Sequence, residues 1–278
     1  MSPTPSPTTA AAPNAAGQPL PIVFSHANGF PAGTYRVLFE HWRRAGRTVH
    51  ALERFGHDPR YPVTSNWRGL RDQLIDFIDK EVGGPAVLVG HSLGGMLSLL
   101  AACRRPDLAA QLVLLDSPVV TGWRARSVQV LKRSGLMQRF SPGKVSHQRR
   151  YQWPDRAAVL AHFQSKTAFA RWDERVLADY VASGFEERNG QVELAFQRAV
   201  ETRIYNTLPH HLGSLLKRHP PRCPVAFIAG TESVEARQGG LATARALAQE
   251  RFQWMEGSHL YPMERPDDTA AAVLAMLD

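Results

Sequence analysis

Residues 85–103 read PAVLVGHSLGGMLSLLAAC, the sequence of a buried strand, a tight turn and a helix in succession. Residues 85–90 form a run that is apolar on both faces, which is typical of a strand buried in a parallel sheet. The pattern of residues 93–103 indicates a helix. Between them, Gly90-His-Ser-Leu-Gly94 matches G-x-S-x-G, the tight strand-to-helix turn that lifts a serine hydroxyl clear of a sheet. The following helix directs its free N–H groups and positive dipole end at the same place. We therefore predict that Ser92 is a covalent nucleophile.

Strands and helices alternate on both sides of this stretch. Short apolar runs predict strands at 21–26, 48–52, 112–115, 225–229 and 252–255. Helical spacing predicts helices at 34–45, from a cap at Asn66 onward, at 237–249 and at 267–277. This alternation predicts a doubly wound, mostly parallel sheet with right-handed crossovers. We assign residues 21–117 and 221–278 to this core.

The middle of the chain, residues 118–220, breaks the alternation. It contains helical patterns at 155–169 and 173–183 and few strand signals. We predict a helical cap, or lid, over the carboxyl ends of the strands, where open α/β sheets bind ligands. Residues 118–222 hold fourteen arginines and four lysines against eight acidic residues, a net charge of +10. We interpret these charges first as solvated helix faces; the alternative is an electropositive lid that attracts anionic substrates.

The remaining composition narrows the class of protein. Residues 1–20 are rich in Pro, Thr, Ala and Ser and lack the pattern of a secretory signal, so we expect a disordered tail. No run approaches the roughly 18 to 20 apolar residues of a membrane span. Cys103 and Cys223 lie outside any metal-ligand spacing, so we expect no metal. We expect a cytoplasmic protein, and no motif indicates a nucleic-acid partner.

A histidine near the carboxyl terminus is the candidate general base. His259 follows the last predicted strand and precedes the last predicted helix. In a doubly wound sheet that loop returns to the edge where the nucleophile lies. An imidazole there can take the serine proton and later give it to the leaving group.

The acid that orients this histidine has three candidates. Asp116 ends an apolar strand on the ligand side of the sheet, and it is the first choice. The loop after residues 225–229 offers Glu232 and Glu235 instead, with Ser233 at the position where a G-x-x-D pattern would place a carboxylate. All three preserve the chain order serine, acid, histidine.

The loop after the first strand, Ser25-His-Ala-Asn-Gly-Phe-Pro31, can supply oxyanion donors. Its backbone N–H groups, together with the N–H of Leu93, can hold the oxygen of a tetrahedral intermediate. Asn28 is the first candidate in this loop and Phe30 the second, while Gly29 provides a permissive backbone.

These three segments together resemble the α/β-hydrolase superfamily, in its group of esterases with one core and a cap. The resemblance covers about 21–118 and 222–278, and it implies the α/β-hydrolase fold and a triad hydrolase with neither metal nor organic cofactor. It supports Asp116, because some members carry the acid after the strand that follows the nucleophile helix. The sequence departs from the family at Ala27, where His-Gly is usual, and in an N-terminal antiparallel hairpin that is missing or reduced.

We therefore expect hydrolysis of a carboxylic ester or thioester, with a small-molecule acyl substrate as the partner. An alternative with the same triad is a carbon–carbon bond hydrolase or lyase that acts on a small anionic substrate. A third hypothesis is a non-catalytic binding protein that keeps the fold. A serine at position 92 argues against relatives that use an aspartate there, the haloalkane dehalogenases and epoxide hydrolases.

Overall fold

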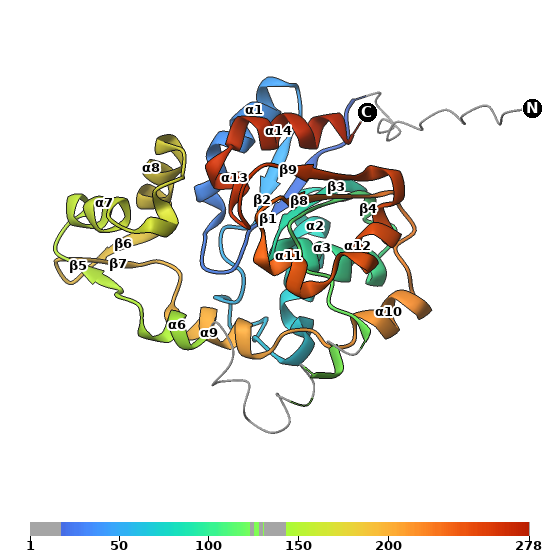
Figure 1. Ribbon diagram of the computed structural model, residues 1–278, viewed down its shortest axis with the longest axis horizontal. Coiled ribbons are helices and arrows are strands. Elements are labelled where there is room, and N and C mark those ends of the chain that lie inside the picture. The colour runs from blue at the N-terminus through green and yellow to red at the C-terminus, as the bar shows by residue number, and fades with distance from the viewer. Residues whose placement is uncertain (1–17, 123–124, 128–129, 131–142, 278) are drawn as a thin grey trace, which may run out of the picture.

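A six-stranded sheet forms the centre of the molecule (Figure 1). The computed structural model describes residues 18–122, 125–127, 130 and 143–277, so most of the expected tail lies outside the described residues. The strand order is β2-β1-β3-β4-β8-β9, and every pairing is parallel. The strands are β1 Ile22–Ser25, β2 Val49–Ala51, β3 Ala86–His91, β4 Ala109–Leu115, β8 Val225–Gly230 and β9 Phe252–Met255. The predicted parallel sheet is confirmed.

The strands are apolar on both faces because helices cover both sides of the sheet. Every residue of β1, β3 and β8 is buried. Successive residues point into different layers: Val23 and Leu88 join one core cluster, whereas Phe24 and Val89 join the other. This alternation is the period-2 geometry of a strand with a core on each face.

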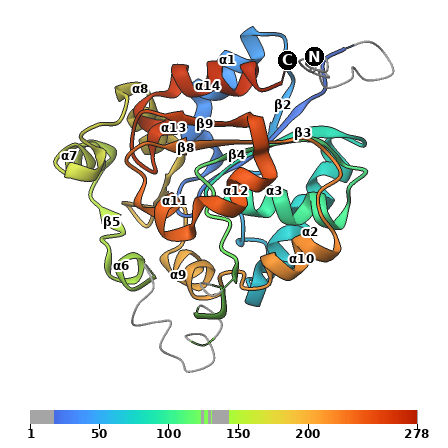
Figure 2. The same cartoon turned by 45° about the vertical axis from the view of Figure 1, so that its right-hand side comes forward.

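The two helical layers come from different parts of the chain. Helices α1 (Arg36–Arg44) and α14 (Pro266–Ala275) pack together on one face, where the Trp42 indole donates a hydrogen bond to the carbonyl of Ala270 at 3.1 Å. Figure 2 shows this pair on one side of the sheet and α2 and α3 on the other. The second layer contains α2 Arg68–Glu81, α3 Leu93–Arg104, α10 Leu212–Arg218 and α12 Leu241–Ala248.

The strand order reverses between β1 and β3. The chain proceeds from β1 outward to β2, then crosses back to β3 on the other side of β1. Ser25, which ends β1, lies opposite Gly90 of β3. Ligands of doubly wound sheets bind at such a reversal, beyond the carboxyl ends of the strands. The fold therefore brings the loop at 26–31 beside Ser92.

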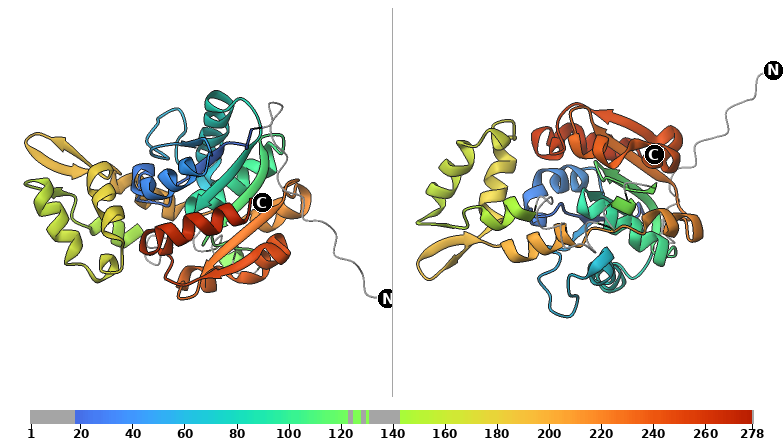
Figure 3. Two further views of the ribbon diagram at one scale, coloured as in Figure 1. Left: turned by 90° about the horizontal axis from the view of Figure 1, so that it is seen from above. Right: turned by 60° about the horizontal axis from the view of Figure 1, so that its bottom comes forward.

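The segment between β4 and β8 contains both helices and strands. Besides α10, its described helices include α6 Gly143–Gln148, α7 Arg156–Gln164, α8 Glu174–Ser183 and α9 Arg198–Asn206. An antiparallel sheet of β5 (Gln152–Trp153), β7 (Gln191–Leu194) and β6 (Phe185–Arg188) accompanies them. Figure 3 shows α7, α8 and this sheet projecting to one side of the core.

The small sheet adds strands to an insertion that the sequence predicts as helical, with few strand signals. Its hairpin turns at Asn189 and Gly190, both with positive φ (51° and 74°). Asn-Gly is the strongest short-range signal for a hairpin, because both residues tolerate that backbone conformation. The sequence contains this signal, but the charged residues Glu186, Glu187 and Glu193 weaken the apolar alternation by which strands are predicted.

Two smaller predictions are wrong. Asn66 does not cap α2: its φ is 64°, the residue before the helix is Trp67, and the Asn66 side chain accepts the N–H of His210 at 3.0 Å. The helix expected at 237–249 is two helices, α11 (Val234–Gly239) and α12, separated at Gly240 with φ 85°. The remaining short elements are α13 Tyr261–Glu264 and the 3-10 turns Ala32–Tyr35, Ser65–Trp67, Thr167–Phe169 and Gln249–Arg251.

Candidate active site

Ser92 lies in a strained turn between β3 and α3. Its φ is 54° and its ψ is −113°, a backbone conformation that is costly for a residue other than glycine. The turn is possible because its neighbours lack side chains. A Cβ on Gly90 would lie 2.4 Å from the carbonyl carbon of Gly94, and one on Gly94 would lie 1.9 Å from the carbonyl oxygen of Ser25. The G-x-S-x-G glycines thus allow α3 to pack against both β3 and the end of β1.

The structure brings Ser92, His259 and Asp116 together in one hydrogen-bonded line. His259 Nε2 lies 2.9 Å from Ser92 Oγ, and His259 Nδ1 lies 2.6 Å from Asp116 Oδ2. The Asp116 carboxylate is fully buried, whereas the His259 side chain is 16% exposed. This is the geometry of a nucleophile, a base and an acid that orients the base.

Asp116 has further hydrogen-bond donors, which compensate for its burial. Its Oδ1 accepts the N–H of Gly230 at 2.8 Å, and its Oδ2 also accepts the hydroxyl of Ser233. Ser233 in turn accepts the N–H of Ala236 and so caps α11. Burying a carboxylate is tolerable when such donors surround it. Ser233, at the more usual acid position, therefore supports the carboxylate of Asp116 rather than replacing it.

The two glutamates considered as alternatives do not contact His259. Glu232 pairs with Arg171 at 2.6 Å, and its side chain is 54% exposed. That guanidinium lowers the pKa of the Glu232 carboxyl. Glu235 lies exposed in the first turn of α11. Among the candidates, only Asp116 has a hydrogen bond with the imidazole in the described part of the chain.

The loop after β1 has two backbone N–H groups without a hydrogen-bond acceptor among the described residues, those of Asn28 and Gly29. The N–H of Phe30 closes a turn onto the carbonyl of Ala27 at 3.2 Å, and the N–H of Ala27 donates to the Tyr35 hydroxyl at 3.2 Å. Leu93, at the first turn of α3, also has its N–H free of any described partner. This arrangement favours Asn28 over Phe30 as an oxyanion donor, together with Leu93.

A buried hydrogen-bond chain that the sequence analysis did not predict connects this loop to the base. Burial lowers the pKa of His91 well below its ordinary value, so its ring is neutral. His91 Nε2–H donates to the carbonyl of His259 at 2.8 Å, which leaves Nδ1 to accept the Tyr35 hydroxyl at 2.7 Å. Tyr35 then accepts the N–H of Ala27. The only sequence signal was His91 itself, inside the G-x-S-x-G motif.

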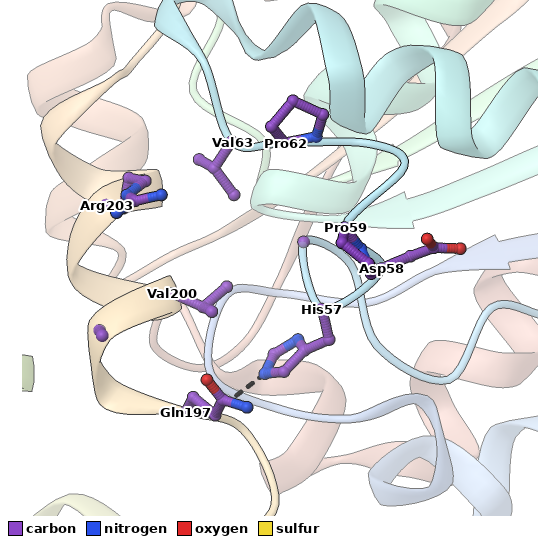
Figure 4. Close-up of a pocket in the computed structure, with 10 residues that line it drawn as sticks. His57, Asp58, Pro59, Pro62, Val63, Gln197, Val200 and Arg203 are labelled. Carbon is purple, nitrogen blue, oxygen red and sulfur yellow. Dashed lines mark hydrogen bonds between the residues drawn. The ribbon is translucent and has the colours of Figure 1, made fainter.

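A second chain joins the same loop to α9. His26 Nε2 accepts the N–H of Phe55 at 3.0 Å, the Phe55 carbonyl accepts His57 Nδ1–H at 3.0 Å, and His57 Nε2 accepts the N–H of Gln197 at 3.0 Å. Burial lowers the pKa of His26 to about 4 and also lowers that of His57. Figure 4 shows His57 and Gln197 at the edge of a cavity of about 440 Å³, which Val63, Val200 and Arg203 also line.

Two charged side chains lie over the loop after β1, and sequence reasoning did not identify either. Glu201 of α9 is 6% exposed, and its Oε1 lies 3.0 Å from where a Cβ on Gly29 would be. Arg149 Nη2 lies 2.8 Å from Glu201 Oε2, although this ion pair is not aligned as a hydrogen bond. Burial raises the pKa of Glu201, and the Arg149 guanidinium opposes that shift. The two residues are far apart in sequence, so only the packing of the segment after β4 brings them together.

Neither a metal site nor a membrane span is found in the residues that the structure describes. No group of His, Cys, Asp and Glu side chains there could hold a metal ion. None of the helices in the described ranges is long and apolar enough to cross a membrane. Both cysteines are free thiols, and burial raises the pKa of Cys103 to about 12 and that of Cys223 to about 11.

The fold and the serine–histidine–aspartate geometry are those of an α/β hydrolase, and the sequence comparison agrees. Residues 22–272 match the alpha/beta hydrolase family, so the chain belongs to that family. The predicted family resemblance and fold class are therefore confirmed.

The chain is similar to several lipases and hydrolases. It is 24% identical to the mouse sn-1-specific diacylglycerol lipase ABHD11 over 84% of this chain and 73% of that protein. It is 37% identical to lipase LipV of Mycobacterium tuberculosis over 35% of this chain and 43% of the lipase, so the match spans less than half of that relative. Among solved structures, E-2-(acetamidomethylene)succinate hydrolase superposes with a TM-score of 0.74, at 22% identity, over 94% of this chain and 92% of that one.

Proposed function

We propose that this hydrolase cleaves a carboxylic ester or thioester through an acyl-enzyme on Ser92. The observation that carries the proposal is the continuous line from Ser92 Oγ through His259 (2.9 Å) to Asp116 (2.6 Å). Two of the relatives are named lipases, which favours an ester as the bond that is cleaved.

The first half-reaction would form the acyl-enzyme. Ser92 Oγ attacks the acyl carbonyl carbon while its proton moves to His259 Nε2. Asp116 accepts the hydrogen bond from Nδ1–H of His259 and stabilises the imidazolium that results. The N–H groups of Asn28 and Leu93 hold the oxygen that becomes negative. His259 then gives its proton to the leaving alkoxide or thiolate as the bond to the carbonyl carbon breaks.

The second half-reaction would return the enzyme to its starting state. A water molecule loses a proton to His259 and attacks the acyl carbonyl carbon, with the oxyanion in the same place. The tetrahedral intermediate collapses by breaking the bond to Ser92 Oγ, which recovers its proton from His259. The products are a carboxylic acid and an alcohol or thiol.

Removal of the nucleophile tests the proposal. We expect Ser92→Ala to abolish hydrolysis of a p-nitrophenyl ester and labelling by a fluorophosphonate probe, because both reactions need the Ser92 oxygen. Intact-mass measurement before and after labelling gives the readout. If the variant is still labelled at another serine, the nucleophile has been assigned incorrectly.

A second candidate function is hydrolysis or lysis of a carbon–carbon bond in a small anionic substrate. The similarity to a hydrolase whose name contains a succinate favours the anionic substrate of this alternative, although that name does not specify a carbon–carbon bond. Turnover of β-diketones in preference to acyl esters would support this alternative. A third candidate, a binding protein without catalysis, would be favoured if the purified protein reacted with no phosphonate probe.

A further inference from the structure

The loop after β1 lies beneath a group of buried polar side chains that the proposed mechanism does not use. Glu201 and Arg149 come from the segment after β4, and Asn28 comes from the loop itself. The Asn28 amide Nδ2–H donates to the backbone carbonyl of Glu201 at 3.2 Å, so this loop and α9 are in direct contact. We call Asn28, Arg149, Tyr180 and Glu201 the polar roof.

Several polar atoms of the polar roof have no hydrogen-bond partner among the described residues. Asn28 and Glu201 are each 6% exposed and Tyr180 is 1% exposed. Asn28 Oδ1 and the Tyr180 hydroxyl are buried without a described hydrogen-bond partner. A buried polar group left unpaired costs roughly 1 to 3 kcal/mol. Side chains with this cost, gathered beside the loop that supplies the proposed oxyanion donors, indicate a polar group that completes them.

The free atoms fit a hydroxyl group. Asn28 Oδ1 and the Glu201 carboxylate accept hydrogen bonds, whereas the Tyr180 hydroxyl can donate one. An alcohol does both, through one O–H and two lone pairs. Aromatic rings lie beside these atoms: the ring centroid of Tyr180 is 5.6 Å from that of Phe30 and 5.8 Å from that of Trp172. Aromatic rings next to polar atoms suit a carbon skeleton that carries hydroxyls.

The charges do not fit a carboxylate. Arg149 is the basic residue of the polar roof, and Glu201 at 2.8 Å neutralises it. An anionic group that approached the loop would meet the Glu201 carboxylate, which lies against Gly29. Like charges at such a distance repel each other, so the net-neutral pair disfavours an anion there.

We propose that the polar roof binds a hydroxyl group of the substrate beside the oxyanion loop. The substrate class is then an ester with a hydroxyl near the scissile bond, either on the alcohol side, as in a polyol ester, or on the acyl side, as in a hydroxyacyl ester. This inference rests on the proposed hydrolysis at Ser92.

Matched substrate pairs test the proposal with the full-length protein. Comparing kcat/KM of glycerol monobutyrate with that of propyl butyrate measures the effect of a hydroxyl on the alcohol side. Comparing ethyl 3-hydroxybutyrate with ethyl butyrate measures the effect of one on the acyl side. Monoethyl succinate measures a carboxylate. We expect one of the two hydroxylated esters to exceed its partner about tenfold in kcat/KM, the size of one or two hydrogen bonds. The pair that shows the preference identifies the side of the ester.

Two variants test whether the polar roof is responsible. Tyr180→Phe removes only the hydrogen-bond donor. We expect the ratio of kcat/KM between the hydroxylated ester and its partner to fall about tenfold, because kcat/KM of the hydroxylated ester falls. Glu201→Gln should also lower that preference, and it should raise turnover of monoethyl succinate because Arg149 loses its counter-charge. Tyr61→Phe is the matched control: its hydroxyl contacts Asp76, away from the polar roof, and both ratios should stay unchanged.

The outcomes separate this inference from the proposed function. Three results would each overturn the binding role of the polar roof and leave the proposed function standing. The esters could all be hydrolysed without a preference for a hydroxyl, or the preference could survive both variants. The third result is a preference of the wild-type protein for monoethyl succinate. If no ester were hydrolysed and Ser92 resisted the fluorophosphonate probe, the proposed function would fail and the inference with it.

Discussion

Asp116 shows at the scale of a residue how a buried charge can be accommodated. It follows β4 directly, with φ 42°, and accepts hydrogen bonds from Gly230, Ser233 and His259. Each donor replaces a hydrogen bond that a carboxylate oxygen would make to water, and each also fixes the direction of the carboxylate. A fixed acceptor at Nδ1 keeps the imidazole proton on that nitrogen, so Nε2 is left to face Ser92.

The acid can be tested by an isosteric change. We expect Asp116→Asn to lower kcat by about 10³- to 10⁴-fold, because an amide neither stabilises the imidazolium nor fixes the tautomer. Steady-state hydrolysis of a p-nitrophenyl ester measures the effect. Glu235→Gln is the control and should stay within twofold of the wild type. The reverse pattern would move the acid to the loop after β8.

The sequence predicted the serine and the histidine of the candidate site more directly than it distinguished among acids. Ser92 and His259 followed from a motif and from the order of strands. The choice of Asp116 over Glu232 and Glu235 depended on where two loops meet, which periodicity does not report. Arg149 and Glu201 gave no local signal at all, because their pairing depends on packing between segments about fifty residues apart.

At the scale of elements, one contact holds the candidate site together: the first turn of α3 against the end of β1. Gly94 allows the approach, since a Cβ there would lie 1.9 Å from the Ser25 carbonyl oxygen and 2.8 Å from that of His26. The helix terminus and the loop that supply the proposed oxyanion donors are therefore held at one fixed separation.

A single methyl group should disrupt this contact. We expect Gly94→Ala to lower the free energy of unfolding by about 3 kcal/mol or more, because two backbone segments would have to separate. Urea titration followed by circular dichroism gives the measurement. Gly84→Ala is the control, since no other atom lies within 4 Å of its added Cβ, and it should be close to neutral. An equal effect of the two changes would refute the contact's importance.

The strands of the large sheet were predictable from their pattern, whereas those of the hairpin of β6 and β7 were not, for one physical reason. Strands buried on both faces must be apolar throughout, as in β3 and β8. A hairpin with one solvated face carries charges, such as Glu186 and Arg188, and its pattern is weak. Only its turn residues, Asn189 and Gly190, gave a signal.

At the scale of the whole molecule, the basic excess of residues 118–222 is partly balanced by ion pairs. Arg171 pairs with Glu232 and Arg175 with Asp267, so arginines of this segment contact acidic residues of the core. Exposed pairs of this kind contribute little to stability and weaken with salt. They do reduce the positive field that the sequence suggested.

Acid should destabilise the molecule through its buried neutral histidines. Burial lowers the pKa of His26 from 6.5 to about 4, so below pH 6.5 the unfolded chain binds a proton that the folded protein excludes. Stability from this group is complete above pH 6.5 and falls by about 3 kcal/mol as the pH drops towards 4.

Comparison with one variant isolates this contribution. We expect His26→Gln to unfold with a smaller difference in free energy between pH 7.5 and pH 5 than the wild type, measured by urea titration at both values. The glutamine oxygen can still accept the Phe55 N–H, so the fold is retained. Identical pH dependence in the two proteins would contradict the assignment.

The chain from His259 through His91 to Tyr35 also decides which of two imidazoles can serve as the base. The ring centroid of His91, at the end of β3, lies 5.2 Å from that of His259, in the loop after β9. A carbonyl and a hydroxyl already occupy both nitrogens of His91, and its direction of donation is fixed. His91 therefore has no lone pair left for a migrating proton. In the proposed mechanism the proton of Ser92 can therefore move only to His259, which lies 2.9 Å from its oxygen, and not to the second imidazole beside it.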